Sequence, residues 1–370
     1  MNKRLQIQIP PGMAALLIVV VLIVVQWSWW HGLVHHTTSK PGGGPSGGPM
    51  SLVKQLDILG RTDVTVVTFS GDTEPGDTDG PGHAARFDRP TGLALDNQGN
   101  LYVADTGNHR IRKITPNGIT TTLAGGEMGY VDGTALQARF NAPCGVCAAP
   151  DGSLYVTDTG NNRLRRIQNG QVTTVEMRSL TGSPWQQNLL SGIALISGPT
   201  PYLLVADATD RRVLKIRLDG TVESKQEVAG PPTSVVGTPN NAVAIPQSAT
   251  LMLGTQTLRD VLLVGGDAVP EVKVRPALHH PVALWPLGDN WLVADYDYGA
   301  VFLVRNGMAE MLAGHYNSGG NMRGARDGDG SRAMFNTVCG IVSDGGKYVY
   351  VADTGGNSIR RIDLSKFRGR

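Results

Sequence analysis

Hydrophobic and polar residues alternate in short runs along most of this chain. The stretch LYVADTGNHRIRKI at residues 101–114 is followed by a close copy, LYVTDTGNNRLRRI, at residues 154–167. Each half of the stretch alternates with the period of a β-strand, and the D-T-G-N between the halves consists of turn-forming residues. The pattern therefore predicts a β-hairpin that is built more than once.

The hairpin belongs to a longer unit, of which the chain contains six copies. A strand such as TGLAL at 91–95 precedes the hairpin, and further copies lie at residues 191–216, 240–264, 281–304 and 338–362. The copy at 240–264 keeps the hydrophobic outline but loses the polar signature. The hairpins are spaced about 40 to 58 residues apart, which is typical of four-stranded β-propeller blades.

A β-rich run after each hairpin predicts the outer, fourth strand of a blade. These runs lie at residues 119–123, 172–176, 222–228, 271–275 and 308–312. The sixth unit ends without such a run, whereas residues 64–69 (VTVVTF) precede the first unit. Pairing this run with the last blade would close the ring and cover an exposed strand edge. The sequence thus predicts an all-β, six-bladed propeller closed by an N-terminal strand.

The repeated units resemble NHL repeats. The resemblance covers roughly residues 62–366, and its strongest marks are G-[LIV]-A, YVADTGN and the following R-[IL]-x-[KR]-I. NHL-like propellers include protein-binding scaffolds, RNA binders, modules of adhesion proteins and metal-dependent enzymes such as the peptidylglycine lyases. The resemblance implies a fold of the six-bladed NHL type, and it leaves the function open between these classes.

An apolar segment at residues 13–30 follows Lys3 and Arg4 near the N-terminus. Its length and its tryptophans predict one transmembrane helix, a single-pass signal anchor, with residues 1–12 inside the cell and the propeller outside. A cleaved signal peptide is the alternative, although no small-residue cleavage site follows. Residues 31–60 form a predicted Gly/Pro-rich linker, and residues 61–370 form the propeller. The chain has no N-x-[ST] acceptor, which favours a bacterial periplasm or cell surface.

Composition narrows the choice of partners only slightly. The net charge is +2, so nothing in the whole chain indicates nucleic acid as a partner. Cys144, Cys147 and Cys339 make no disulfide framework in so large a chain. Cys144 and Cys147 form a C-x-x-C on a predicted strand, where residues three apart face opposite ways. The motif therefore favours small core or channel-lining residues over a redox pair.

One aspartate closes each polar hairpin, and we interpret these residues as turn formers. They are Asp105, Asp158, Asp207, Asp295 and Asp353. A catalytic residue would not need five copies, so no catalytic residue is assigned. The third strands also carry Arg112, Lys113, Arg165, Arg166, Lys215, Arg360 and Arg361. These residues predict one basic side of the ring, which is either a solvated face or a surface for anionic glycans or lipid head groups.

Two sets of residues are candidates for ligand binding. The first lies just inside the entrance to the inner strands and should ring the mouth of the central channel: Thr91, Cys144, Ser191, Asn240, Val282 and Cys339, with His280 beside it. The second belongs to long connections at residues 71–87, 125–140 and 314–335: Asp77, Asp79, His83, Asp132, His315, Asp327 and Asp329. Long loops commonly carry function. We expect this face to bind a protein, peptide or glycan outside the membrane.

A metal-dependent hydrolase or lyase acting in the channel is the alternative. The predicted mouth contains no carboxylate, and His280 and His109 are scattered, whereas zinc sites normally present three or four ligands. The acidic pairs at 77–79 and 327–329 leave calcium open, although neither matches an EF-hand loop. No cofactor is therefore predicted, and a binding scaffold is favoured over an enzyme.

Overall fold

The computed structural model describes residues 58–186, 188–227, 231–237, 243–244, 278–305, 308–317, 320–321 and 324–367. The predicted membrane segment at 13–30, Asn240 and most of the predicted fourth unit lie outside these residues. Within the described residues, no helix has the length and apolar character needed to cross a bilayer.

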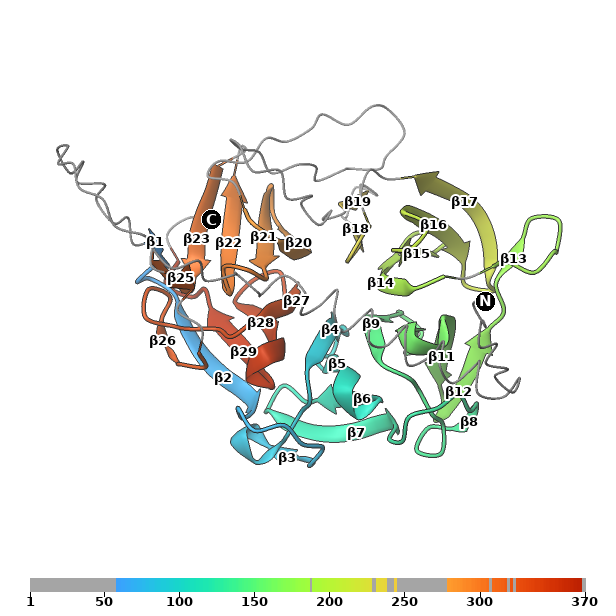
Figure 1. Cartoon of the computed structure of the whole chain (residues 1–370), viewed down its shortest axis with the longest axis horizontal. Helices are drawn as coiled ribbons and strands as arrows, with labels where there is room; N and C mark the ends of the chain where they lie inside the picture. The colour runs from blue at the N-terminus through green and yellow to red at the C-terminus, as the bar shows by residue number, and fades with distance from the viewer. Residues whose placement is uncertain are drawn as a thin grey trace, which may run out of the picture. The chain divides into compact units, whose positions relative to one another are not determined.

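Antiparallel sheets form a ring of blades, with the first strand of each blade nearest the centre in Figure 1. Blade 1 consists of β4 (Pro90–Leu95), β5 (Leu101–Asp105), β6 (Arg110–Ile114) and β7 (Ile119–Gly125). Blade 2 consists of β9 (Pro143–Ala148), β10 (Leu154–Asp158), β11 (Arg163–Gln168) and β12 (Gln171–Val175). The all-β propeller prediction is confirmed.

The later blades repeat this order. Each blade keeps the number of its sequence unit, and no blade is numbered 4 because most of the fourth unit lies outside the described residues. Blade 3 consists of β14 (Leu190–Ile196), β15 (Tyr202–Asp207), β16 (Arg212–Arg217) and β17 (Thr221–Glu227). Blade 5 consists of β20 (Pro281–Leu287), β21 (Asn290–Asp295), β22 (Ala300–Arg305) and β23 (Met308–Ala313). Blade 6 consists of β27 (Val338–Ser343), β28 (Tyr348–Asp353), β29 (Ser358–Asp363) and β2 (Thr65–Gly71).

The outer strand of blade 6 comes from the N-terminal end of the domain, as the sequence predicts. β2 pairs antiparallel with β29, with Thr65 opposite Asp363. Just before β2, β1 (Ile58–Leu59) pairs with β24 (His315–Asn317), which pairs in turn with β25 (Gly320–Asn321). The N-terminal end therefore joins blades 5 and 6.

The described residues form five blades and not the six predicted. Between blades 3 and 5 they contain a two-stranded sheet of β18 (Val236–Gly237) and β19 (Val243–Ala244). Thr233, which precedes β18, donates a hydrogen bond to the Val282 carbonyl (3.1 Å). Residues 232–236 (P-T-S-V-V) parallel residues 90–94 (P-T-G-L-A) of blade 1, and the place of Asn240 stays a prediction because Asn240 lies outside the described residues.

The long connections run down the outer edge of the next blade, where Figure 1 shows β3 and β8 at the perimeter. They add short edge strands to blades 1, 2 and 6: β3 (Gly80–Pro81), β8 (Gly133–Thr134) and β26 (Gly328–Asp329). The connection before blade 3 adds β13 (Arg178–Ser179) to that blade. Pairing of this kind covers edges that would otherwise template aggregation. The expectation that these loops belong to one face is therefore too narrow, because they also form the rim.

The core lies between neighbouring blades. Phe87, Phe140 and Phe335 end the three long connections, and each is fully buried. Phe140 packs among residues of blades 1 and 2, including Ile111 and Val156. These phenylalanines fill the wedge between adjacent twisted sheets, and their burial holds each connection against the ring.

Candidate functional site

A buried arginine on the third strand of blades 1, 2 and 6 holds each long connection in place. Arg112 donates from Nη1 to Asp105 (2.8 Å) and from Nη2 to Asp79 (2.7 Å). Its Nη groups also donate to the carbonyls of Arg86 and Thr78. Arg165 and Arg360 repeat these contacts, with the pairs Asp158 and Asp132, and Asp353 and Asp327. We call this repeated unit the arginine clamp.

The clamp changes the interpretation of the basic residues. Arg112, Arg165 and Arg360 are fully buried, each about 5 Å from the ring of its own phenylalanine. The prediction that these three arginines form a basic surface is wrong, because each guanidinium is buried and donates to two carboxylates and two carbonyls. The burial of Arg112 could have been predicted from the alternation of the strand, because Arg112 shares a strand face with Ile114, a core residue.

All five hairpin aspartates are buried and bonded to their own hairpins. Asp158 accepts from the Asn141 backbone N–H (2.7 Å), Asn161 Nδ2 (2.8 Å) and Arg165. Asp295 instead accepts four backbone N–H groups, from His279, His280, Asp297 and Tyr298. Burial raises the pKa of Asp105 and of Asp353 to about 6, against the lowering effect of their hydrogen bonds and of the nearby arginine.

The hairpin residues between the strands also join neighbouring blades. They form single 3-10 turns: η2 (Thr106–Asn108), η3 (Thr159–Asn161) and η4 (Thr354–Gly356), whereas η1 (Gly82–Ala84) lies in the first long connection. The threonines donate to the first carbonyl of the next inner strand, as Thr159 does to Leu190 (2.6 Å). The sequence interpretation treated D-T-G-N as turn chemistry alone, so this link between blades was missed.

The residue directly after each of these three turns is left-handed. His109, Asn162 and Asn357 have φ of 54°, 52° and 47°, and each accepts a backbone N–H from the next blade. His109 Nδ1 accepts from Ala142 (3.0 Å), where Asn162 accepts from Leu189 (2.8 Å). His109 is thus a structural equivalent of asparagine, although it was counted as a scattered candidate metal ligand.

Two described residues of the predicted channel mouth use their hydroxyl groups to bond neighbouring blades. Thr91 donates to the Cys144 carbonyl (2.9 Å), and Ser191 donates to the Pro232 carbonyl (3.0 Å). Burial raises the pKa of the Cys144 thiol and takes that of Cys339 to about 12. Protonated thiols and bonded hydroxyls make poor nucleophiles.

Cys147 does not lie beside Cys144. It belongs to a core cluster with Tyr155 and Leu164, and burial raises the pKa of its thiol to about 12. All three cysteines are free. The C-x-x-C pattern therefore has the geometry expected of a strand, with its two thiols on opposite faces.

A polar cluster distinguishes blade 5, where the hairpin reads D-Y-D-Y in place of D-T-G-N. His280 Nδ1 lies 3.8 Å from Asp297 Oδ1, and the His280 ring lies 5.4 Å from the Tyr296 ring. The Tyr298 hydroxyl lies 3.1 Å from His279 Nε2. Within the described ranges, no three His, Cys, Asp or Glu side chains come together in a way that could hold a metal ion.

The candidate residues of the long connections do not converge on one point. Asp77 pairs with Arg110 (3.1 Å), and Asp329 accepts from the backbone and hydroxyl of Ser331. His83 is exposed on η1, whereas His315 lies on β24 beside β1. Asp79, Asp132 and Asp327 belong to the arginine clamps. In the third connection Asp327, not Asp329, occupies the place of Asp79 and Asp132.

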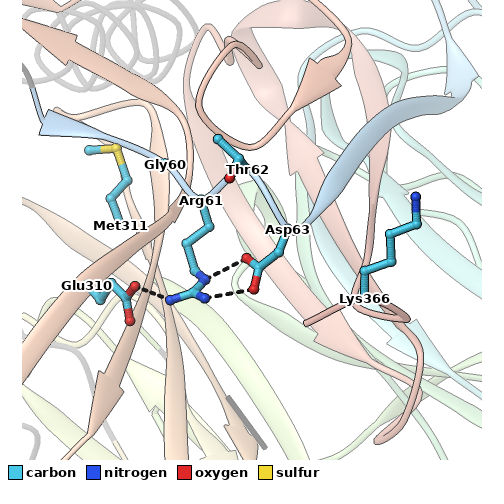
Figure 2. Close-up of a pocket in the computed structure, with 7 residues that line it drawn as sticks. All are labelled: Gly60, Arg61, Thr62, Asp63, Glu310, Met311 and Lys366. Carbon is cyan, nitrogen blue, oxygen red and sulfur yellow. Dashed lines mark hydrogen bonds and ion pairs between the residues drawn. The ribbon is translucent and has the colours of Figure 1, made fainter. Parts of the chain in front are cut away.

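A shallow cleft of about 820 Å³ lies on the rim where the N-terminal end joins blades 5 and 6 (Figure 2). Its lining residues are Gly60, Arg61, Thr62, Asp63, Glu310, Met311 and Lys366. Arg61 donates to both oxygens of Asp63 (2.7 Å each) and pairs with Glu310. Its guanidinium lies 4.9 Å from the Phe367 ring. The pair with Glu310 joins the N-terminal end to β23, and the ring contact with Phe367 joins it to the C-terminal end.

Comparison with known families decides the nature of the repeat. The NHL repeat family matches residues 87–114 and 140–167, which span the first three strands of blades 1 and 2. The chain carries NHL repeats. It is 33% identical over 163 residues to Protein SUPPRESSOR OF QUENCHING 1 of Arabidopsis thaliana and 40% identical over 95 residues to NHL repeat-containing protein 2 of Homo sapiens.

These matches cover 41% and 24% of this chain but only 16% and 13% of the relatives. Among solved structures, a Bacteroides thetaiotaomicron protein of unknown function matches with a TM-score of 0.61 at 16% identity, covering 81% of this chain and 76% of that one. An auxiliary nutrient binding protein of the same organism matches with a TM-score of 0.57 at 17% identity and the same coverage. Streptogramin B lyase matches with a TM-score of 0.52 at 12% identity, covering 81% of this chain and 97% of the lyase. These likenesses show the propeller fold.

Proposed function

We propose that this chain is a binding scaffold that holds a partner through the exposed side chains of its long connections. One observation carries the proposal: the same arginine clamp fixes three connections, while the exposed residues on them differ. The first connection presents Glu74 and Asp77, whereas the second presents Tyr130 and Leu136. A fixed frame with variable side chains is the arrangement that rigid scaffolds use for recognition.

We extend the proposal to a six-bladed ring tethered to a membrane outside the cytoplasm. Six inner strands support the blade count, because β18 contacts β14 on one side and Thr233 bonds to Val282 of β20 on the other. The apolar segment at 13–30 supports the tether. Burial of Arg112, Arg165 and Arg360 reduces the positive charge that the third strands present, so a protein, peptide or glycan is a better-supported partner than nucleic acid.

Photo-crosslinking in the native cell tests the scaffold proposal. A benzophenone amino acid replaces Glu74, Leu136 or Arg332, one exposed position on each connection, or Gln98 on the opposite face as the matched control. We expect adducts with a macromolecular partner from at least one connection and none from Gln98. Adducts from Gln98 alone, or from no position, would contradict the proposal.

An enzyme acting at the channel mouth is the second candidate, favoured by the His280 and Asp297 pair in blade 5. Streptogramin B lyase has a similar fold, but at 12% identity the likeness transfers no activity. The purified full-length chain is dialysed, and its zinc and calcium are measured beside His280→Ala. Stoichiometric metal that is lost in the variant would favour the enzyme, and metal-free wild type would favour the scaffold.

A further inference from the structure

The second long connection exposes four large apolar or aromatic side chains. Met128, Tyr130, Val131 and Leu136 are 61%, 49%, 43% and 69% exposed. We call these four residues the docking ridge. We propose that the docking ridge seats in an apolar groove of a partner protein, an inference that rests on the scaffold function above.

The first connection serves as an internal reference, because matching contacts align the two loops residue by residue. Asn108 Nδ2 donates to the Gly76 carbonyl and Asn161 Nδ2 to the Gly129 carbonyl, each at 2.7 Å. Aligned on these contacts and on the clamp aspartates, the ridge positions correspond to Pro75, Asp77, Thr78 and His83. The same backbone frame therefore exists without large apolar side chains at these positions, so their presence at 125–140 calls for a role other than folding.

The ridge is held rigid before any partner binds. Arg165 Nη2 donates to the Val131 carbonyl (2.9 Å), and the Tyr130 hydroxyl lies 2.9 Å from Thr174 Oγ1. The guanidinium groups of Arg163 and Arg165 lie 5.8 and 5.0 Å from the Tyr130 ring. Pre-organisation of this kind lowers the entropy cost of association. Such a loop is built to present its side chains.

The charges on this connection indicate an uncharged partner surface. Its charged residues are Glu127, Asp132 and Arg139. Glu127 pairs with Arg139, and Asp132 pairs with Arg165, each at 2.6 Å. An anionic glycan or lipid headgroup would need free cations, and the loop offers none. Tyrosine, methionine and arginine are instead enriched at protein interfaces.

The size and position of the ridge favour a groove over a second copy of the chain. Four such side chains expose an area on the order of a few hundred Å², well below the roughly 800 Å² that each partner buries in a standard interface. The connection lies at the perimeter of the ring beside β8 (Figure 1). Two convex ridges would touch over even less area, so a concave partner gives the larger contact.

Crosslinking and affinity measurements test the docking ridge together. A benzophenone amino acid at Leu136 of the full-length chain should capture one protein in the native cell, whereas the same group at Met308, an exposed apolar residue outside the connections, should not. The captured protein is then purified on its own. Its affinity is measured for the wild type, for V131T/L136H, which carries the residues of the first connection, and for Met308→Thr.

We expect V131T/L136H to lose at least about tenfold in affinity, with M308T binding as the wild type does and all three chains equally stable. Equal affinity of V131T/L136H and wild type would overturn the ridge, as would adducts at Leu136 with lipid or with a second copy only. Adducts from Glu74 or Arg332 but none from Leu136 would contradict the docking-ridge proposal and still support the scaffold proposal. Adducts from no connection would contradict both proposals.

Discussion

At the scale of single residues, the clamp arginines and the hairpin aspartates are charged side chains that are buried and hold the structure together. Arg165 has no exposed surface, yet it contacts a buried aspartate, a partly exposed aspartate and two carbonyls. A buried ion pair adds little to the free energy of unfolding compared with a hydrophobic substitute, but removing one partner leaves a buried, uncompensated charge. The arginine clamps therefore fix geometry, and their loss should be costly.

Replacing Arg165 with Met should lower the free energy of unfolding by about 3 to 5 kcal/mol, because Asp158 would remain buried without its guanidinium. Urea denaturation of the full-length chain measures the change. Arg166→Met is the matched control on the next position, since Arg166 and its partner Asp151 are partly exposed and such pairs contribute about 0 to 1 kcal/mol. Similar losses in both variants would contradict the assignment.

The buried aspartates should give an unusual pH dependence. Burial raises the pKa of Asp105 and Asp353 from 3.8 to about 6. Between these pH values the folded chain keeps protons that the unfolded chain releases, so the free energy of unfolding should fall as pH rises from about 4 to 6. Asp79 and Asp96, whose pKa values are lowered, titrate below this window.

Chemical denaturation at a series of pH values measures this slope. Asp105→Asn removes one titrating group and should flatten the slope, even though the variant is less stable overall. A stability that rises from pH 4 to 6 would show that the clamp aspartates stay ionised throughout.

At the scale of the element, each hairpin is both a turn and a link to the next blade. The alternation of LYVAD and RIRKI was enough to predict the strands, because period two is the direct mark of a half-buried strand. It could not show the close approach at Gly107: a Cβ there would meet the Asp88 carboxylate at 2.3 Å, so that side chain would have to move. In these hairpins positive φ occurs at His109, Asn162 and Asn357 and not at the D-T-G-N glycines.

His109→Asn should leave stability close to that of the wild type, because asparagine fills the same place in blades 2 and 6 and accepts the same backbone N–H. His109→Ala should lose about 1 to 3 kcal/mol, since the Ala142 N–H would lose its acceptor. Thermal unfolding of both variants checks the pair. Equal losses would show that the imidazole has a role of its own.

At the scale of the whole molecule, the residues that recur from unit to unit build the ring, and the residues that differ between units are candidates for recognition. Closure by β2 was predictable because one blade lacked an outer strand and the N-terminus offered one. The docking ridge was not predictable, since an exposed apolar side chain and a core side chain look alike in a sequence; only burial distinguishes Leu136 from Leu154. The repeated residues build the ring and fix the connections, and the residues that differ face outward.

Hydrogen–deuterium exchange of the full-length chain tests this account most directly. The long connection at 125–140 is paired internally, with Gly129 N–H bonded to the Phe140 carbonyl (2.9 Å) and Arg139 N–H bonded to the Val131 carbonyl (3.0 Å). We predict that its amides exchange as slowly as those of β12, and that Arg165→Met accelerates this connection alone. Exchange at the rate of an unstructured peptide in the wild type would contradict the claim that the clamps present a fixed binding surface.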